Sequence, residues 1–128
     1  MSGHSMDPTF HNGQSFWCEP LSLDDVAHLQ PGAVLVVRDR PRHDRTLIKR
    51  VAGLGGDVLE ARGGALYRNG AVEQSFITLT GQNQLEDFAS ITIPERSLFV
   101  LGDNFEGSQD SRDIGPFRYQ DVVCQARP

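Results

Sequence analysis

Apolar residues in this chain occur in short runs separated by turn-forming residues, a pattern typical of short β-strands. Val34–Val37 is apolar and mostly β-branched, and the polar segment Arg38–Arg45 separates it from a second run, Thr46–Ala52. This arrangement predicts two strands joined by a hairpin. The same reasoning predicts further short elements at Ser15–Glu19, Val58–Ala61, Ala65–Tyr67, Ile91–Ile93, Leu98–Leu101 and Asp121–Val123.

Turn-forming and capping residues indicate how these strands are connected. Gly63-Gly64 and Asn69-Gly70 are hairpin signals, and Gly53–Asp57 is predicted to be a glycine-rich turn. Ser22–Asp25 is a capping pattern, which predicts a helix of one or two turns that continues through Leu29.

Two stretches have no regular pattern. Ser75–Ser90 is predicted to be a surface excursion, and Gly102–Gly115 a long polar loop with three Asp, two Ser and three Gly. The predicted fold class is mainly β, a compact antiparallel β-sheet structure with one or two short helices. A length of 128 residues fits one domain, residues 1–128, with one core.

Charge and composition narrow the classes of function. The net charge of −5 argues against a nucleic-acid partner, because phosphate binding needs a basic surface. No run of about 18 apolar residues is present, so we expect the chain as given to have no transmembrane segment and to be soluble. Cys18 and Cys124 could pair, but we favour two small buried or half-buried thiols, which leaves the redox compartment open.

The first segment with candidate chemistry is Ser2–Thr9. Ser5 lies between Gly3, which permits unusual backbone conformations, and Pro8, which restricts them. Taken alone, this segment is typical of a polar N-terminus. The histidines also lie in the first third of the chain, and we expect all four at the surface: His4, His11, His28 and His43.

The second candidate segment is Leu47–Val51. Strand alternation places Leu47, Lys49 and Val51 on one face. A lysine among apolar residues loses its proton more easily, because burial disfavours the charged form, and it can then act as a base. The alternative is a strand lysine whose amine reaches water, and this stretch alone favours that alternative.

The third candidate segment is Gly102–Arg112, which directly follows an apolar strand, where functional loops gather. Asp110 and Arg112 could form an ion pair that holds the loop, and Ser108 could hydrogen-bond a lysine amine. A solvated surface loop is an equally good interpretation. The acidic residues do not follow the calcium-loop pattern, so we expect no metal.

Together, the three segments resemble the bacterial type I signal peptidases, a family of Ser–Lys peptidases that remove signal peptides. Gly3–Gly13 is similar to the family's nucleophile motif, and Lys49–Asp57 is similar to its lysine motif. The third motif is matched by Gly102-Asp103-Asn104, Ser108, Asp110-Ser111-Arg112 and Gly115-Pro116. The resemblance covers nearly the whole chain and implies a compact antiparallel β-sheet peptidase fold that needs no cofactor.

The resemblance also implies roles for individual residues in a serine endopeptidase. Ser5 would be the nucleophile, and its backbone N–H an oxyanion donor; Lys49 would be the general base. Ser108 would orient the Lys49 amine, with Asp110 and Arg112 bracing the loop. Gly3 stands where some members carry a serine as a second oxyanion donor. The family's pockets for small residues favour Ala-X-Ala substrates. The positions that line these pockets are occupied here by Met6, Phe10, Leu47 and Ile48.

The family context implies a partner and a location. The substrate would be a precursor protein or signal peptide, cleaved near a membrane surface on the extracytoplasmic face of the cytoplasmic membrane. Members carry a membrane-spanning helix before the serine motif, whereas four residues precede Ser5 here, which implies a trimmed product or a soluble relative. Two alternatives remain open: a dedicated maturation or conjugation-type peptidase with one protein substrate, and an inactive relative that binds peptides. A self-cleaving repressor-type protease is disfavoured, because no DNA-binding segment is visible.

Overall fold

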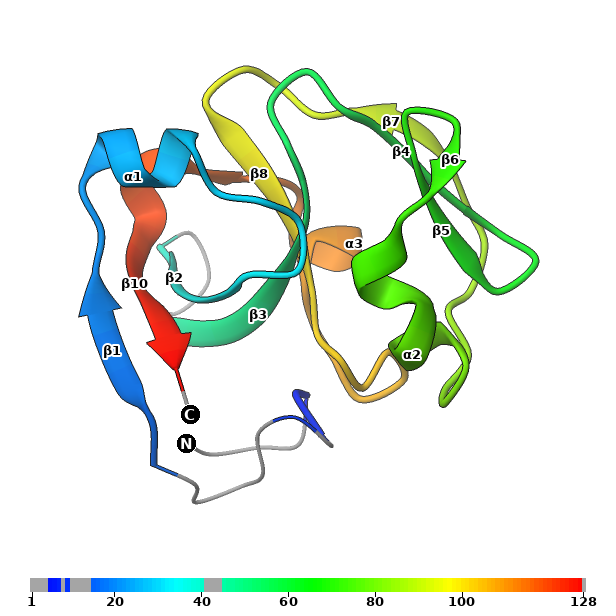
Figure 1. Ribbon diagram of the computed structural model, residues 1–128, viewed down its shortest axis with the longest axis horizontal. Helices are drawn as coiled ribbons and strands as arrows, with labels where there is room; N and C mark the ends of the chain where they lie inside the picture. The colour runs from blue at the N-terminus through cyan, green and yellow to red at the C-terminus, as the bar shows by residue number, and fades with distance from the viewer. Residues whose placement is uncertain (1–4, 8, 10–14, 41–44, 128) are drawn as a thin grey trace.

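The computed structural model describes residues 5–7, 9, 15–40 and 45–127, and it contains two antiparallel sheets (Figure 1). The larger sheet has six strands in the spatial order β1 (Trp17–Pro20), β10 (Val122–Arg127), β2 (Val34–Asp39), β3 (Arg45–Leu54), β8 (Ser97–Leu101) and β9 (Phe117–Arg118). The smaller sheet has four, in the order β6 (Ala71–Val72), β5 (Ala65–Arg68), β4 (Val58–Arg62) and β7 (Phe88–Thr92). The prediction of a mainly β fold is confirmed.

The helices are short: α1 (Leu23–Ala27), η1 (Gln74–Phe76), α2 (Ile77–Thr80), α3 (Ser111–Ile114) and η2 (Tyr119–Asp121). The capping pattern before α1 forms as predicted, since Ser22 and Asp25 exchange hydrogen bonds of 3.0 and 3.1 Å. The helix ends at Ala27 rather than at Leu29, because His28 leaves the helical conformation, with φ −106° and ψ 10°. In the part of the chain described, no helix has the length and apolar character needed to cross a membrane.

Several predicted boundaries move once packing is taken into account. β1 begins at Trp17 instead of Ser15, and β10 continues past Val123 to Arg127 because both of its edges are paired, with β1 and β2. β3 includes Gly53, which the sequence assigned to a turn. A Cβ on Gly53 would lie 2.8 Å from Ile93 Cδ1, so this glycine permits close packing between chain segments.

The two irregular stretches contain regular structure. Ser75–Ser90 forms most of η1, all of α2 and the start of β7, because Phe76, Leu79 and Leu85 are buried in the core. The predicted strand Ile91–Ile93 therefore begins earlier, at Phe88, and ends at Thr92. The long polar loop after β8 contains the four-residue helix α3.

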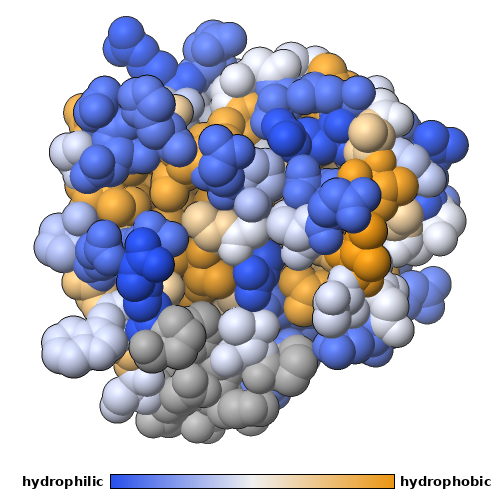
Figure 2. Space-filling model, in the orientation of Figure 1, coloured by the Kyte–Doolittle hydropathy of each residue, from blue (hydrophilic) through white to orange (hydrophobic). Residues whose placement is uncertain are grey.

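Strand β8 connects the cores of the two sheets. Phe99 and Leu101 pack in a cluster with residues of the smaller sheet, whereas Leu98 and Val100 pack in a cluster with α1, β2 and β3. Alternate residues of a strand face opposite sides, so every residue of β8 is buried. On the face of the molecule drawn in Figure 2, polar side chains are mixed with apolar patches. Because β8 is buried along its whole length, the loop that follows it begins in the interior of the molecule.

The cysteines are joined, which corrects the expectation of two thiols. Cys18 of β1 and Cys124 of β10 form a disulfide, with their Cα atoms 5.4 Å apart. Antiparallel pairing of these strands places Pro20 opposite Cys124 and Cys18 opposite Ala126, which brings the two cysteines within bridging distance. Their separation of 106 residues hides this relationship in the sequence.

Candidate active site

Lys49 lies in the middle of β3 with only 2% of its surface exposed. It is the only lysine in the chain. Leu47 and Val51 pack in the cluster that contains Leu35, the residue directly opposite Lys49 on β2. The predicted alternation is confirmed, whereas the expectation that the amine reaches water, which the stretch alone favoured, is wrong.

The environment of Lys49 favours its neutral form. Burial lowers the pKa of Lys49 from 10.5 to about 8, because removing water disfavours the charged ammonium. Arg112 and Arg45 lower the pKa further, whereas Asp110 and Asp113 raise it without cancelling the effect of burial. An amine with such a pKa is partly neutral near physiological pH and can accept a proton.

The Lys49 amine contacts the loop after β8. Its Nζ donates to Ser108 Oγ at 3.0 Å, and Ser108 Oγ donates to Asp110 Oδ2 at 2.7 Å. A hydroxyl has one proton to donate, so Ser108 accepts from Lys49. The lone pair of a neutral Lys49 therefore remains free for another proton donor.

Asp110 is the centre of the loop's hydrogen-bond network. Its carboxylate is fully buried and accepts from Arg112 Nε and Nη2 at 2.8 and 2.9 Å, and from the Gly102 N–H at 2.9 Å. Arg112 also donates to the Phe105 carbonyl oxygen at 2.8 Å. The predicted Asp110–Arg112 ion pair is present, and it connects both ends of the loop. A cavity of about 510 Å³ lies beside it, with Ser108 and Arg112 in its wall.

The same loop holds the main chain of Ser5. The Asn104 N–H donates to the Ser5 carbonyl oxygen at 2.8 Å, and the Asp103 N–H lies 3.4 Å from the Met6 sulfur. A Cβ on Gly102 would overlap the Ser108 side chain and lie 2.7 Å from the Ser5 carbonyl oxygen. The Ser108 side chain and the Ser5 carbonyl oxygen thus approach the same point beside Gly102, where only glycine leaves room.

An ion pair that the sequence reasoning did not identify joins the lysine strand to this loop. Arg50 Nε and Nη2 donate to the two oxygens of the buried Asp103 carboxylate at 2.8 and 2.7 Å, and Nη1 donates to the Gly32 carbonyl oxygen at 2.7 Å. Thr9 also hydrogen-bonds Asp103. Arg50 lies in the lysine motif and Asp103 in the third motif, and these positions could have indicated a shared role.

Asn83 is a second residue that the sequence reasoning missed. Its Nδ2 donates to the Asp103 carbonyl oxygen at 3.0 Å, and its Oδ1 accepts from the Phe105 N–H at 2.7 Å. It lies in the stretch predicted to be a surface excursion, about twenty residues from its partners. No sequence signal of ours pointed to it.

The candidate substrate-binding residues separate into two groups. Met6 and Ile48 pack in one apolar cluster with Val34 and Val36, whereas Leu47 packs on the opposite face of β3. Phe10 and Gly3 lie outside the described residues, as do three of the four histidines; His28 is exposed as expected. Among described residues, no group of three or more His, Cys, Asp or Glu is placed to hold a metal.

The fold and the relatives of this chain are those of a serine-type endopeptidase, a hydrolase. The model of the signal peptidase family, peptidase S26, matches residues 1–128, and the chain belongs to that family. The resemblance indicated by the three motifs is confirmed.

Individual relatives agree with this assignment. Signal peptidase I S of Bacillus subtilis (strain 168) is 30% identical over 133 residues, which cover 96% of this chain and 70% of that protein. Signal peptidase I V of the same strain is 31% identical and covers 96% of this chain and 79% of that protein. The crystal structure of a signal peptidase I from Enterococcus faecalis V583 superposes with a TM-score of 0.65 at 28% identity, over 76% of this chain and 95% of that one.

Proposed function

We propose that this chain cleaves signal peptides, or similar precursor segments, after small residues of the Ala-X-Ala type, using a Ser5–Lys49 dyad. The observation that carries the proposal is the buried Lys49 amine, hydrogen-bonded to Ser108 in the loop that also holds the Ser5 main chain. A buried neutral amine near a serine provides the base that a serine nucleophile needs.

The reaction begins when the neutral Lys49 Nζ accepts the Ser5 hydroxyl proton. Ser5 Oγ then forms a bond to the scissile carbonyl carbon, and the carbonyl oxygen becomes an oxyanion to which the Ser5 N–H donates. The Lys49 ammonium returns the proton to the leaving amine as the C–N bond breaks, which leaves an acyl-enzyme. Lys49 next takes a proton from a water molecule whose oxygen bonds to the acyl carbon. The ester bond to Ser5 Oγ then breaks, and the Lys49 ammonium returns the proton to Ser5 Oγ, which releases the acid product and restores Ser5. Gly3, at the alternative donor position, has no hydroxyl to contribute.

The supporting residues act on Lys49. Ser108 orients the amine by accepting one of its protons, and Asp110 fixes Ser108 by accepting the hydroxyl proton. Arg112 neutralises the buried Asp110 carboxylate and joins it to the Phe105 carbonyl. These contacts fix the direction of the lone pair before substrate arrives, which is how preorganised sites lower reaction barriers.

Met6 and Ile48, which pack together, would form one wall for small substrate side chains, with Phe10, whereas Leu47, on the opposite face of β3, would line a separate pocket. The partner would be a precursor protein with a signal peptide, cleaved at a membrane surface on the extracytoplasmic side. The Cys18–Cys124 disulfide supports that location, because disulfides persist in oxidising compartments.

The test is cleavage of a peptide with an Ala-X-Ala site, in detergent, by the parent chain and by the Ser5→Ala and Lys49→Met variants. We expect cleavage by the parent alone. Cleavage that survives in either variant contradicts the dyad. Binding of the peptide without cleavage by the parent favours a peptide-binding relative, and cleavage of one protein but not of the peptide favours a dedicated maturation peptidase.

A further inference from the structure

Arg45 lies on the same strand face as Lys49, four residues earlier on β3. These two basic side chains contact consecutive residues of the loop after β8. Lys49 donates to Ser108, and Arg45 Nη2 donates to Oε1 of the neighbouring Gln109. β3 therefore contacts Ser108 directly through Lys49, and the residue next to it, Gln109, through Arg45.

A buried carboxylate fixes the guanidinium of Arg45. Asp39 lies directly opposite Arg45 in the β2–β3 pairing and is fully buried. Its Oδ2 accepts from Arg45 Nε at 3.3 Å, and Oδ1 has no hydrogen-bond partner among the residues described. The buried Asp39 carboxylate therefore depends on its contact with Arg45, because an uncompensated buried charge is costly.

Arg45 also contributes to the electrostatic environment of the Lys49 amine. The charged groups that act on this amine are Asp110, Asp113, Arg112 and Arg45. Arg112 is tied to Asp110 by two hydrogen bonds, so its charge is locally balanced. The Arg45 side chain is 36% exposed, so salt partly screens its influence on Lys49.

We propose that Arg45 is a positioning residue for the reaction, held by Asp39 and holding Gln109 so that the neighbouring Ser108 hydroxyl stays against Lys49. Its positive charge additionally disfavours the ammonium form of Lys49. The proposal rests on the proposed function, because it takes the neutral Lys49 amine to be the base.

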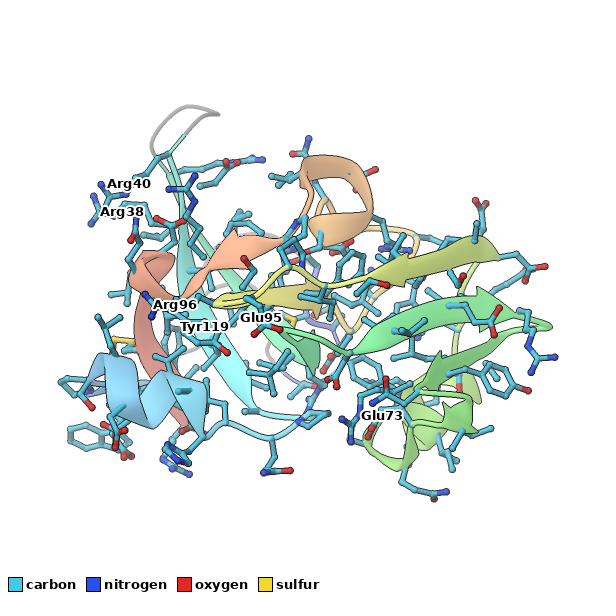
Figure 3. All side chains as sticks on the ribbon, turned by 90° about the horizontal axis from the view of Figure 1, so that it is seen from above. Arg38, Arg40, Glu73, Glu95, Arg96 and Tyr119 are labelled. Atoms are coloured by element: carbon cyan, nitrogen blue, oxygen red, sulfur yellow. A yellow bond between two sulfur atoms is a disulfide. The ribbon has the colours of Figure 1, made fainter. Side chains whose placement is uncertain are left out.

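The test compares Arg45→Met with Arg40→Met, a matched control. Arg40 lies at the outer end of the same hairpin (Figure 3). Its guanidinium pairs with Asp121 at 3.2 Å. The titration of Lys49 is followed by NMR of its Cε carbon at low salt, which needs no activity and gives one signal from the single lysine. We expect the Lys49 midpoint to move to higher pH in Arg45→Met and to stay at the parent value in Arg40→Met.

Kinetics of peptide cleavage test the positioning role separately. We expect kcat at pH 7 to fall about tenfold in Arg45→Met and in Gln109→Ala, because small displacements of a catalytic group are costly. Gln109→Ala removes the tether but no charge, so its Lys49 midpoint should match that of the parent. Arg45→Lys retains the charge but not the guanidinium fork, so we expect partial rescue of kcat.

If Arg45→Met does not fold, the Asp39→Asn, Arg45→Met double variant removes the uncompensated carboxylate and should show the same two changes. The proposal is overturned if kcat and the Lys49 midpoint equal those of Arg40→Met, or if Gln109→Ala has parent kcat. Failure of the proposed function is distinguishable, because the parent would then not cleave the peptide, or Ser5→Ala or Lys49→Met would still cleave it, whereas the Lys49 midpoints report on Arg45 without any activity.

Discussion

The amine of Lys49 donates a 3.0 Å hydrogen bond to the hydroxyl of Ser108, 59 positions later in the chain. Ser108 Oγ–H donates its own hydrogen bond to Asp110, so the contact with Lys49 fixes the amine without occupying the lone pair of its neutral form. The amine is thereby both buried and oriented, the two conditions that a lysine base requires.

Activity should depend on pH through the Lys49 amine. Because the base must be neutral, we expect kcat/KM to rise with pH and to level off above a midpoint near the Lys49 pKa of about 8. Initial rates with an Ala-X-Ala peptide between about pH 5 and about pH 10 measure this profile. A flat profile over that range contradicts a lysine base.

Stability should depend on pH through the same group. The pKa of Lys49 is lowered from 10.5 to about 8 on folding, so the unfolded state binds more protons between these values and stability rises with pH across this window. Below about pH 8, Lys49 is protonated in both the folded and the unfolded state, so the folded state bears the full free-energy cost of the buried ammonium. We therefore expect Lys49→Met to be more stable than the parent at pH 7 by roughly 1–3 kcal/mol, since one pKa unit corresponds to about 1.4 kcal/mol.

Urea unfolding of both chains from pH 7 to pH 10 measures this difference. It should shrink as pH rises through the window. A difference that stays constant would show that Lys49 does not change its protonation on folding.

Removal of the Ser108 hydroxyl should slow catalysis with little effect on the fold. We expect Ser108→Ala to lower kcat by about 100-fold, because Lys49 loses the acceptor that orients it, and effects of this size are typical of acid–base positioning. Ser90→Ala, at an exposed serine of β7, is the matched control and should behave like the parent. Equal kcat values in the two variants contradict an orienting role.

A side chain at Gly102 should disturb the site. In Gly102→Ala the new Cβ meets Ser108 and the Ser5 carbonyl oxygen, so we expect a loss of stability of about 1–3 kcal/mol and a kcat at least about tenfold lower. The control is Gly81→Ala, where the nearest atom is 3.4 Å away and φ is −79°. Thermal unfolding and peptide cleavage test both variants, and similar behaviour of the two would refute the close approach.

The disulfide should stabilise the chain. Cys18 and Cys124 close a long loop, so we expect the Cys18→Ala, Cys124→Ala double variant to lose about 2–4 kcal/mol of unfolding free energy. Reductant should lower the Tm of the parent and leave that of the double variant unchanged. A parent Tm that does not respond to reductant contradicts the bridge.

The sequence predicted those parts of the fold that depend on neighbouring residues. The capping pattern of Ser22 and Asp25, the Gly63-Gly64 and Asn69-Gly70 hairpins and the strands around Lys49 all form, because capping, turn geometry and alternation act over a few residues. The sequence-based prediction was wrong where contacts between distant segments determine the structure. Gly53 was predicted to lie in a turn but lies within β3. Asn83 was predicted to lie in a surface excursion but hydrogen-bonds Asp103 and Phe105.

The sequence by itself determined the family, through three motifs in order, and the strand face on which Lys49 lies. The tertiary structure alone decided that Lys49 is buried, that its amine reaches Ser108, that Arg50 pairs with Asp103 and that Cys18 is joined to Cys124. The physical reason is that burial and long-range pairing depend on how β8 and the following loop pack against β3. Alternation fixes the direction of a side chain, whereas its neighbours and its loss of water come from strands far away in the chain.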